Sequence, residues 1–99
     1  MSLAERRNYI RYDLRHDVLL HCDGLGMVRG TSNNLSAGGM WLICANVRLS
    51  LHQDIELSVV PGRSAEGVLR IPATIVRAGK DGYGVQFKRP LSPHTPLFQ

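Results

Sequence analysis

Cysteine, lysine and long apolar runs are all scarce in this sequence, and each scarcity narrows the class of protein. No run reaches the roughly 18 apolar residues of a membrane-spanning helix, and no signal-peptide pattern opens the chain. The two cysteines, Cys22 and Cys44, have no CxxC spacing and no histidine pair nearby, so a zinc site is not indicated. We expect reduced, at least partly buried thiols in a cytoplasmic protein without a membrane span.

Histidine occurs four times, but never at a spacing that supports chemistry. His16, His21, His52 and His94 are scattered, and no pair is spaced to bind a metal or to activate a nucleophile. The chain also lacks a GxSxG, HExxH or Walker motif. We therefore predict that the protein is not an enzyme and has no catalytic residue, no metal site and no cofactor. The class that remains is a binding module.

Apolar residues come in short alternating runs, which is the pattern of half-buried strands. Turns rich in glycine or proline separate several of them, and no long helical period interrupts the series. The sequence therefore predicts an all-β fold, a small six-stranded antiparallel barrel. Pro72 cannot donate to a strand ladder, so we expect it at an edge position or a bulge. The predicted strands are Val18–Cys22, Met27–Asn33, Met40–Cys44, Asp54–Val60, Val68–Ala78 and Tyr83–Phe87.

Residues 1–99 are predicted to form one domain. A polar, arginine-rich arm at about 4–15 precedes the barrel at about 16–89, and an irregular tail with three prolines fills 90–99. Twelve lysines and arginines against eight acidic residues give a net charge of +4. Most of the twelve are arginines, whose planar guanidinium groups bind phosphate in a bidentate way and stack on bases. The charge therefore favours a phosphate-bearing ligand, although it also permits nucleic acid.

Two short motifs stand out, one in the arm and one in the turn after the second predicted strand. Arg7-Asn8-Tyr9-Ile10-Arg11 has the form RxxxR, and Arg6 adds a third guanidinium just before it. Asn34-Leu35-Ser36-Ala37-Gly38-Gly39 has the form (D/N)xSxxG and combines side-chain oxygens with two glycines. Glycines let a ligand approach the backbone, and the amide N–H groups of such a turn can face an anion. Together the motifs would suit a flat, doubly phosphorylated ligand.

In this order and spacing, the two motifs resemble those of the PilZ domain, a bacterial receptor for cyclic di-GMP. The resemblance runs from about Glu5 to Phe87. It implies a PilZ-like β-barrel whose flexible arm folds across the barrel surface with the ligand, with Arg7 and Arg11 around the phosphates and guanine bases. An arginine just before the motif, here Arg6, implies a stacked ligand pair, so one or two molecules of cyclic di-GMP are expected. PilZ-like domains often close with a helix, and the tail of this chain departs from that pattern.

The resemblance also assigns a ligand-binding role to the second motif. Asn34, Ser36 and Gly39 would contact a guanine edge or a phosphate, with Gly38 beside them. Read without the resemblance, Asn34 and Ser36 are turn residues that bond nearby backbone, a role that can coexist with ligand contact.

Two further residues are candidates for stacking on a guanine base. The resemblance implies an aromatic or planar group at the end of the fifth strand, where Arg77 lies, so Arg77 is either that stacking group or a surface charge. Trp41, the only tryptophan, lines the ligand surface or is covered by the arm, the tail or a partner, with Met40 and Leu42 facing the core.

The leading hypothesis is a cyclic di-GMP-binding receptor or adaptor domain whose ligand-ordered arm changes a surface that an unidentified partner protein reads. The alternative is a PilZ-like protein-interaction domain that binds no nucleotide and uses Trp41, Leu97 and Phe98 for its contacts. A third class, a small barrel that binds RNA or single strands, is suggested by the pI of about 9.6. The few aromatics available for base stacking count against it.

Overall fold

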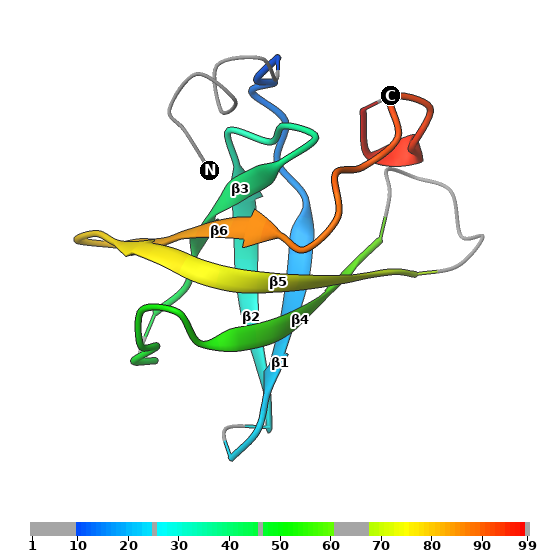
Figure 1. The fold of residues 1–99 in the computed structure, drawn as a ribbon. Coiled ribbons are helices and arrows are strands. Elements are labelled where there is room, and N and C mark those ends of the chain that lie inside the picture. The colour runs from blue at the N-terminus through cyan, green and yellow to red at the C-terminus, as the bar shows by residue number, and fades with distance from the viewer. Residues whose placement is uncertain (1–9, 25, 46, 61–67, 99) are drawn as a thin grey trace.

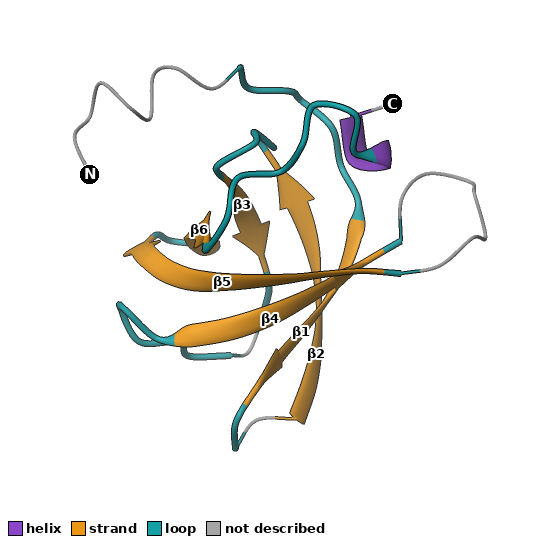
Figure 2. Cartoon of the chain, turned by 45° about the vertical axis from the view of Figure 1, so that its right-hand side comes forward, coloured by secondary structure: helices purple, strands orange, loops and turns teal. Residues whose placement is uncertain are grey.

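The structure, a computed structural model, describes residues 10–24, 26–45, 47–60 and 68–98. Six antiparallel strands close into a barrel in the order β1-β2-β3-β6-β5-β4 (Figures 1 and 2). The predicted all-β barrel is confirmed, and each predicted strand agrees with an observed one to within one residue at either end. The elements are β1 Asp17–Cys22, β2 Gly26–Asn33, β3 Gly39–Ile43, β4 Asp54–Val59, β5 Leu69–Ala78, β6 Gly82–Phe87 and the 3₁₀ turn η1 Pro96–Phe98.

The core fills the inside of the barrel with alternate side chains of five strands, whereas β2 contributes only Ser32 as a buried residue. Successive strand residues point to opposite faces, so the alternating sequence pattern translates directly into an apolar interior and a polar exterior. The inward residues include Val18 and Leu20 of β1, Met40 and Leu42 of β3, Ile55, Leu57 and Val59 of β4, Ile71, Ala73 and Ile75 of β5, and Val85 and Phe87 of β6.

Pro72 lies where β5 extends past the end of β6. Its carbonyl accepts a hydrogen bond of 3.0 Å from the backbone N–H of Lys88, just after β6 ends. Because the nitrogen and carbonyl of a strand residue point to the same side, the missing N–H of Pro72 faces Lys88 and not the ladder with β4. The expectation of an edge position or a bulge therefore holds only in that β6 has ended here, because Lys88 still covers Pro72 and the bulge of β5 lies between Ile75 and Arg77.

The turn that joins β2 to β3 is tied down on both sides. On one side Tyr12 and Leu35 exchange two backbone hydrogen bonds, of 2.7 and 2.9 Å. On the other, the carbonyl of Gly38 accepts from Phe87 N–H and the carbonyl of Ala37 from the N–H of Leu91, both at 2.8 Å. The resemblance implied a flexible arm that folds across the barrel with the ligand, whereas the described part of the arm is already paired with Leu35 at Tyr12.

The C-terminal tail is irregular, as predicted, apart from η1, but it is not free to serve a partner. Leu97 is fully buried. The ring of Phe98 lies 5.1 Å from that of Tyr12, and the Leu97 carbonyl is 3.0 Å from Nε2 of His16. The interpretation of Leu97 and Phe98 as partner contacts is therefore wrong for Leu97 and weakened for Phe98, because burying these apolar side chains within the chain is itself favourable.

Both cysteines are free thiols, Cys22 buried and Cys44 partly buried, as expected. Burial raises the pKa of each thiol, because an apolar surrounding disfavours the thiolate. Neither is therefore a reactive thiolate near neutral pH. No helix in the described part of the chain is long and apolar enough to cross a membrane.

Candidate ligand site

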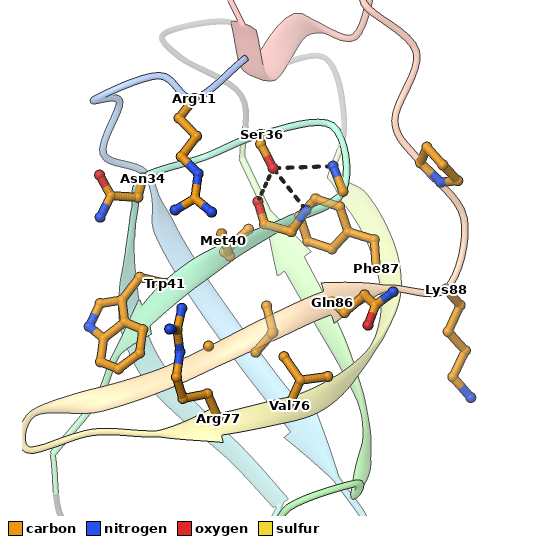
Figure 3. Close-up of a pocket in the computed structure, with 15 residues that line it drawn as sticks. Arg11, Asn34, Ser36, Met40, Trp41, Val76, Arg77, Gln86, Phe87 and Lys88 are labelled. Atoms are coloured by element: carbon orange, nitrogen blue, oxygen red, sulfur yellow. Dashed lines mark hydrogen bonds between the residues drawn. The ribbon is translucent and has the colours of Figure 1, made fainter. Parts of the chain in front are cut away.

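A hollow lies on the outer surface of the barrel over β3, β6 and β5, beneath the arm and the β2–β3 turn (Figure 3). Seven of the nine predicted ligand residues line it, although they come from three separate parts of the chain. The other two, Arg6 and Arg7, lie outside the described residues. The seven are Arg11, Asn34, Ser36, Gly38, Gly39, Trp41 and Arg77.

The turn at the upper rim is organised by the hydroxyl of Ser36. Its oxygen accepts hydrogen bonds from the backbone N–H groups of Gly38 and Gly39, both at 3.2 Å, and donates to the Gly39 carbonyl at 3.3 Å (Figure 3). The expected turn role of Ser36 is therefore confirmed. The expectation that these amides face an anion is wrong for this state, because both already bond to the serine.

Asn34 occupies the left-handed region with a φ of 51°, which asparagine tolerates better than most residues. Its backbone N–H donates to Oδ1 of Asn33 at 2.9 Å. The side chain that bonds nearby backbone is therefore that of Asn33, and not that of Asn34 as expected. The Asn34 amide stands exposed at the rim of the hollow.

Gly39 has a packing reason to be glycine. A Cβ at this position would overlap the backbone carbonyl of Val85 on the neighbouring strand. Its residue type therefore follows from the close approach of β3 and β6, whatever the ligand.

Trp41 forms one side of the hollow and is half-buried by its own barrel. Its ring lies against glycines of β6 and of the β5–β6 turn. A Cβ at Gly79 would overlap the indole, one at Gly82 would come within 3.1 Å of Nε1, and one at Gly84 within 3.7 Å of Cε3. We expected the arm, the tail or a partner to cover the indole of Trp41. Instead the backbone of these glycines covers one part of the ring, and another part faces the hollow.

Arg77 lies in the same cross-strand row as Trp41. The register pairs Trp41 with Gly84 and Gly84 with Arg77, so the indole and the guanidinium flank a glycine on the intervening strand (Figure 3). A Cβ added at Gly84 would lie only 3.3 Å from Cβ of Arg77. The row therefore presents two flat side chains on either side of a residue that has no side chain. Such an arrangement leaves room for a purine base to stack on either of them.

The hollow is positively charged. Arg11, Arg77 and Lys88 line it, and no carboxylate does among the described residues. Lys88 is partly neutralised by an ion pair of 3.1 Å with Asp54, outside the hollow. The net positive potential favours an anionic ligand. Trp41 and Val76 add an apolar surface beside these charges.

Sequence reasoning missed several lining residues, chiefly Gln86 and Lys88 on β6 and its extension and Val76 on β5. A signal for all three was present. Val85 and Phe87 were assigned inward, so period-two alternation places Gln86 and Lys88 outward, on the face that carries Trp41 and Arg77. Ile75 was also assigned inward, so the same alternation places Val76 outward. Alternation fails only at the next residue, Arg77, because the bulge between Ile75 and Arg77 interrupts it.

The ion pair at the rim makes stability depend on pH in a definite direction. Hydrogen bonds from Lys88 and Thr74, and then the charge of Lys88, lower the pKa of Asp54 below its ordinary value of 3.8. The ionised carboxylate thus stabilises the fold above that value, and the contribution is lost as pH falls through the lowered pKa.

We expect acid to lower the urea midpoint more in wild type than in Asp54→Asn, by a small amount because both partners are largely exposed. Asp81→Asn is the control, and an Asp54→Asn protein with the full acid response would contradict the assignment.

The profile of the PilZ domain family matches residues 5–96, nearly the whole chain. The chain belongs to the PilZ domain family. This PilZ domain has no similar sequence among the proteins of curated function.

Two solved structures have the same fold. The inhibitor of motility MotI/DgrA of Bacillus subtilis has a TM-score of 0.70 at 21% identity over 88% of this chain. The PilZ domain of YcgR from Escherichia coli, solved with cyclic di-GMP, has a TM-score of 0.67 at 18% identity, covering 92% of this chain and 83% of that one. The matched region is 44% of the MotI chain, so this PilZ domain spans less than half of that protein.

Proposed function

We propose that this PilZ domain is a receptor for cyclic di-GMP that binds the nucleotide in the hollow over β3, β6 and β5. One observation carries the proposal: Arg11 from the arm, Asn34 and Ser36 from the turn, and Trp41 with Arg77 from the barrel line a single positively charged surface. The two motifs and their resemblance to the PilZ domain made each of these a candidate, and they come from three stretches of the chain, around residues 11, 34–41 and 77. The PilZ domain of YcgR, which has the same fold, was solved with cyclic di-GMP, and this supports the choice of ligand.

The chemistry of the hollow fits the two kinds of group in this nucleotide. Guanidinium groups form charge-assisted hydrogen bonds to phosphate, worth about 1.5–3 kcal/mol each. A guanine stacked on Trp41 or Arg77 adds about 1–3 kcal/mol. Association costs at least about 4 kcal/mol, and micromolar binding needs about 8 kcal/mol net, so several phosphate contacts and a stack are required together. Arg6 and Arg7 would supply the remaining phosphate contacts.

The output of such a receptor would pass through the arm. Arg11 faces the hollow, and the next residue, Tyr12, is held by Leu35 and by the ring of Phe98. Ligand bound to the arginines would order the arm across the barrel and change the surface that an output protein reads. The two free thiols support a reducing compartment, the cytoplasm. No enzymatic step belongs to the proposal.

Calorimetric titration of cyclic di-GMP into the domain tests the proposal. We expect micromolar or tighter binding that is lost in Arg7→Ala/Arg11→Ala. Cyclic di-AMP, with the same charge but different bases, is the control for base recognition and should bind more weakly. A stoichiometry of two would support the stacked pair inferred from Arg6, and a value of one would remove it. A folded sample that gives no heat with cyclic di-GMP at millimolar concentration would overturn the receptor function.

A further inference from the structure

Strand β2 is longer than the part of it that its neighbour β3 covers. β1 pairs with β2 from Thr31 down to Gly26, whereas β3 pairs only with Thr31, Ser32 and Asn33. Residues 26–30 therefore have a strand on one side and none of the described strands on the other. Figures 1 and 2 show this hairpin of β1 and β2 projecting at the end of the barrel opposite the β2–β3 turn. The barrel is closed, but this stretch is an open edge.

The alternation of β2 identifies which backbone groups the edge presents. The N–H of Ser32 donates to the carbonyl of His16, at 2.9 Å, so even-numbered residues of β2 direct their backbone groups to the β1 side. Met27 and Arg29 then direct their N–H and C=O groups outward. Within the described ranges neither residue has a hydrogen bond on that side. Each chain thus offers two donors and two acceptors in a row.

The edge has little of the usual protection. Natural edge strands are shielded by charged side chains, especially lysine, by proline, by a bulge or by a covering segment. Between Gly26 and Gly30 the sequence has no proline and no lysine, the pairing with β1 continues without a bulge, and Arg29 is the one charged residue. Met27, near the hairpin turn, is 62% exposed.

We propose that this edge pairs with the same edge of a second copy of the chain. In a two-fold antiparallel arrangement centred on Val28, Met27 lies opposite Arg29 of the second copy, and Arg29 opposite its Met27. All four outward groups of each chain then form hydrogen bonds, and the two Val28 side chains meet on the inner face as a close pair. The methionine packs along the aliphatic stem of the arginine.

The sequence of the edge selects this register. Shifting one strand so that Arg29 faces Arg29 would put like charges directly opposite. The same shift would place Met27 opposite Thr31, which already pairs with Ile43 of β3. Of the registers with this hydrogen-bond pattern, only the one about Val28 pairs both Met27 and Arg29 within residues 26–30, because centring on Met27 would leave Arg29 opposite a residue outside that range. Neither Met27 nor Arg29 lines the hollow, so both copies keep it open and the inference is independent of the ligand.

Sedimentation equilibrium of the domain over a wide concentration range tests the pairing. The contact is small, so we expect a concentration-dependent dimer of modest affinity, not an obligate one. Met27→Lys puts a lysine opposite Arg29 twice in each dimer, which should raise the dissociation constant roughly tenfold. Met27→Lys/Arg29→Glu replaces both repulsions with opposite-charge pairs, so its dissociation constant should return close to that of wild type.

Both substitutions are at exposed positions, and circular dichroism should show the wild-type fold for each. A wild-type chain that remains monomeric up to millimolar concentration overturns the proposal. So does a dimer that Met27→Lys leaves unchanged, which would lie on another surface. A double variant that stays as weak as the single one would overturn the register centred on Val28.

Discussion

Replacing Arg11 with glutamate is expected to remove measurable binding of cyclic di-GMP while leaving the barrel as stable as before. The loss of one charge-assisted bond in Arg11→Ala already corresponds to roughly a 10- to 150-fold fall in affinity. Glutamate adds repulsion between its carboxylate and the phosphates. The side chain of Arg11 is exposed and has no hydrogen bond or ion pair to another described residue, so folding loses no contact.

Arg15→Glu is the matched control for this experiment. Arg15 lies in the same arm and is also exposed, but it borders a different hollow, with His16 and Asp17. The change in net charge is identical, so calorimetry at one salt concentration separates a specific contact from a general effect of charge. Equal losses in both variants would mean that the arm attracts the ligand only through its overall charge. Wild-type affinity in Arg11→Glu would remove Arg11 from the site.

Replacing Gly39 with alanine is expected to destabilise the domain by about 3 kcal/mol or more, at the upper end for overpacked sites. The added Cβ would overlap the backbone carbonyl of Val85, and neither strand can move without disturbing the ladder between β3 and β6. For a domain of this size each kcal/mol shifts the melting temperature by about 4–8 °C, so the Tm should fall by roughly 12–24 °C. Thermal and urea unfolding followed by circular dichroism measure it.

Gly84→Ala provides the comparison. Its nearest contact would be Cβ of Arg77 at 3.3 Å, so the two strands would need to separate by only a few tenths of an ångström. We expect a clearly smaller loss of stability there. If Gly39→Ala unfolds like wild type, the close approach of β3 and β6 is not what requires this glycine, and a contact with the ligand becomes the better explanation of its place in the motif.

The strands of this PilZ domain were predictable because their signal is local. Alternation puts Ile55, Leu57 and Val59 on one face of β4 with Glu56 and Ser58 on the other, and a pattern of period two has no competing interpretation over six residues. The same logic located the barrel as a whole. It fails only where the backbone departs from regular pleating, as at the bulge before Arg77.

The residues of the candidate site could be proposed from the sequence, but not their geometry. The two motifs pointed to Arg11, Asn34 and Ser36, and strand position suggested Arg77. No local pattern shows that the Ser36 hydroxyl already takes up the amides of its own turn. Nor does one show that Trp41 rests on glycines more than thirty residues further along the chain. Both depend on how separate segments meet, which only the closed barrel determines.

The contact between Tyr12 and Phe98 brings the entry and exit of the chain together. Both lie at the end of the barrel that carries the hollow, and the β1–β2 hairpin lies at the other end (Figure 1). The first and last described segments of the domain therefore lie next to each other in space. A short linker between the two ends, with a new opening in the turn at Asp23–Gly24, would leave every strand pairing in place, which is the condition under which circular permutation is tolerated. Any fused domain, by contrast, would join the barrel beside the hollow, whichever end carries it.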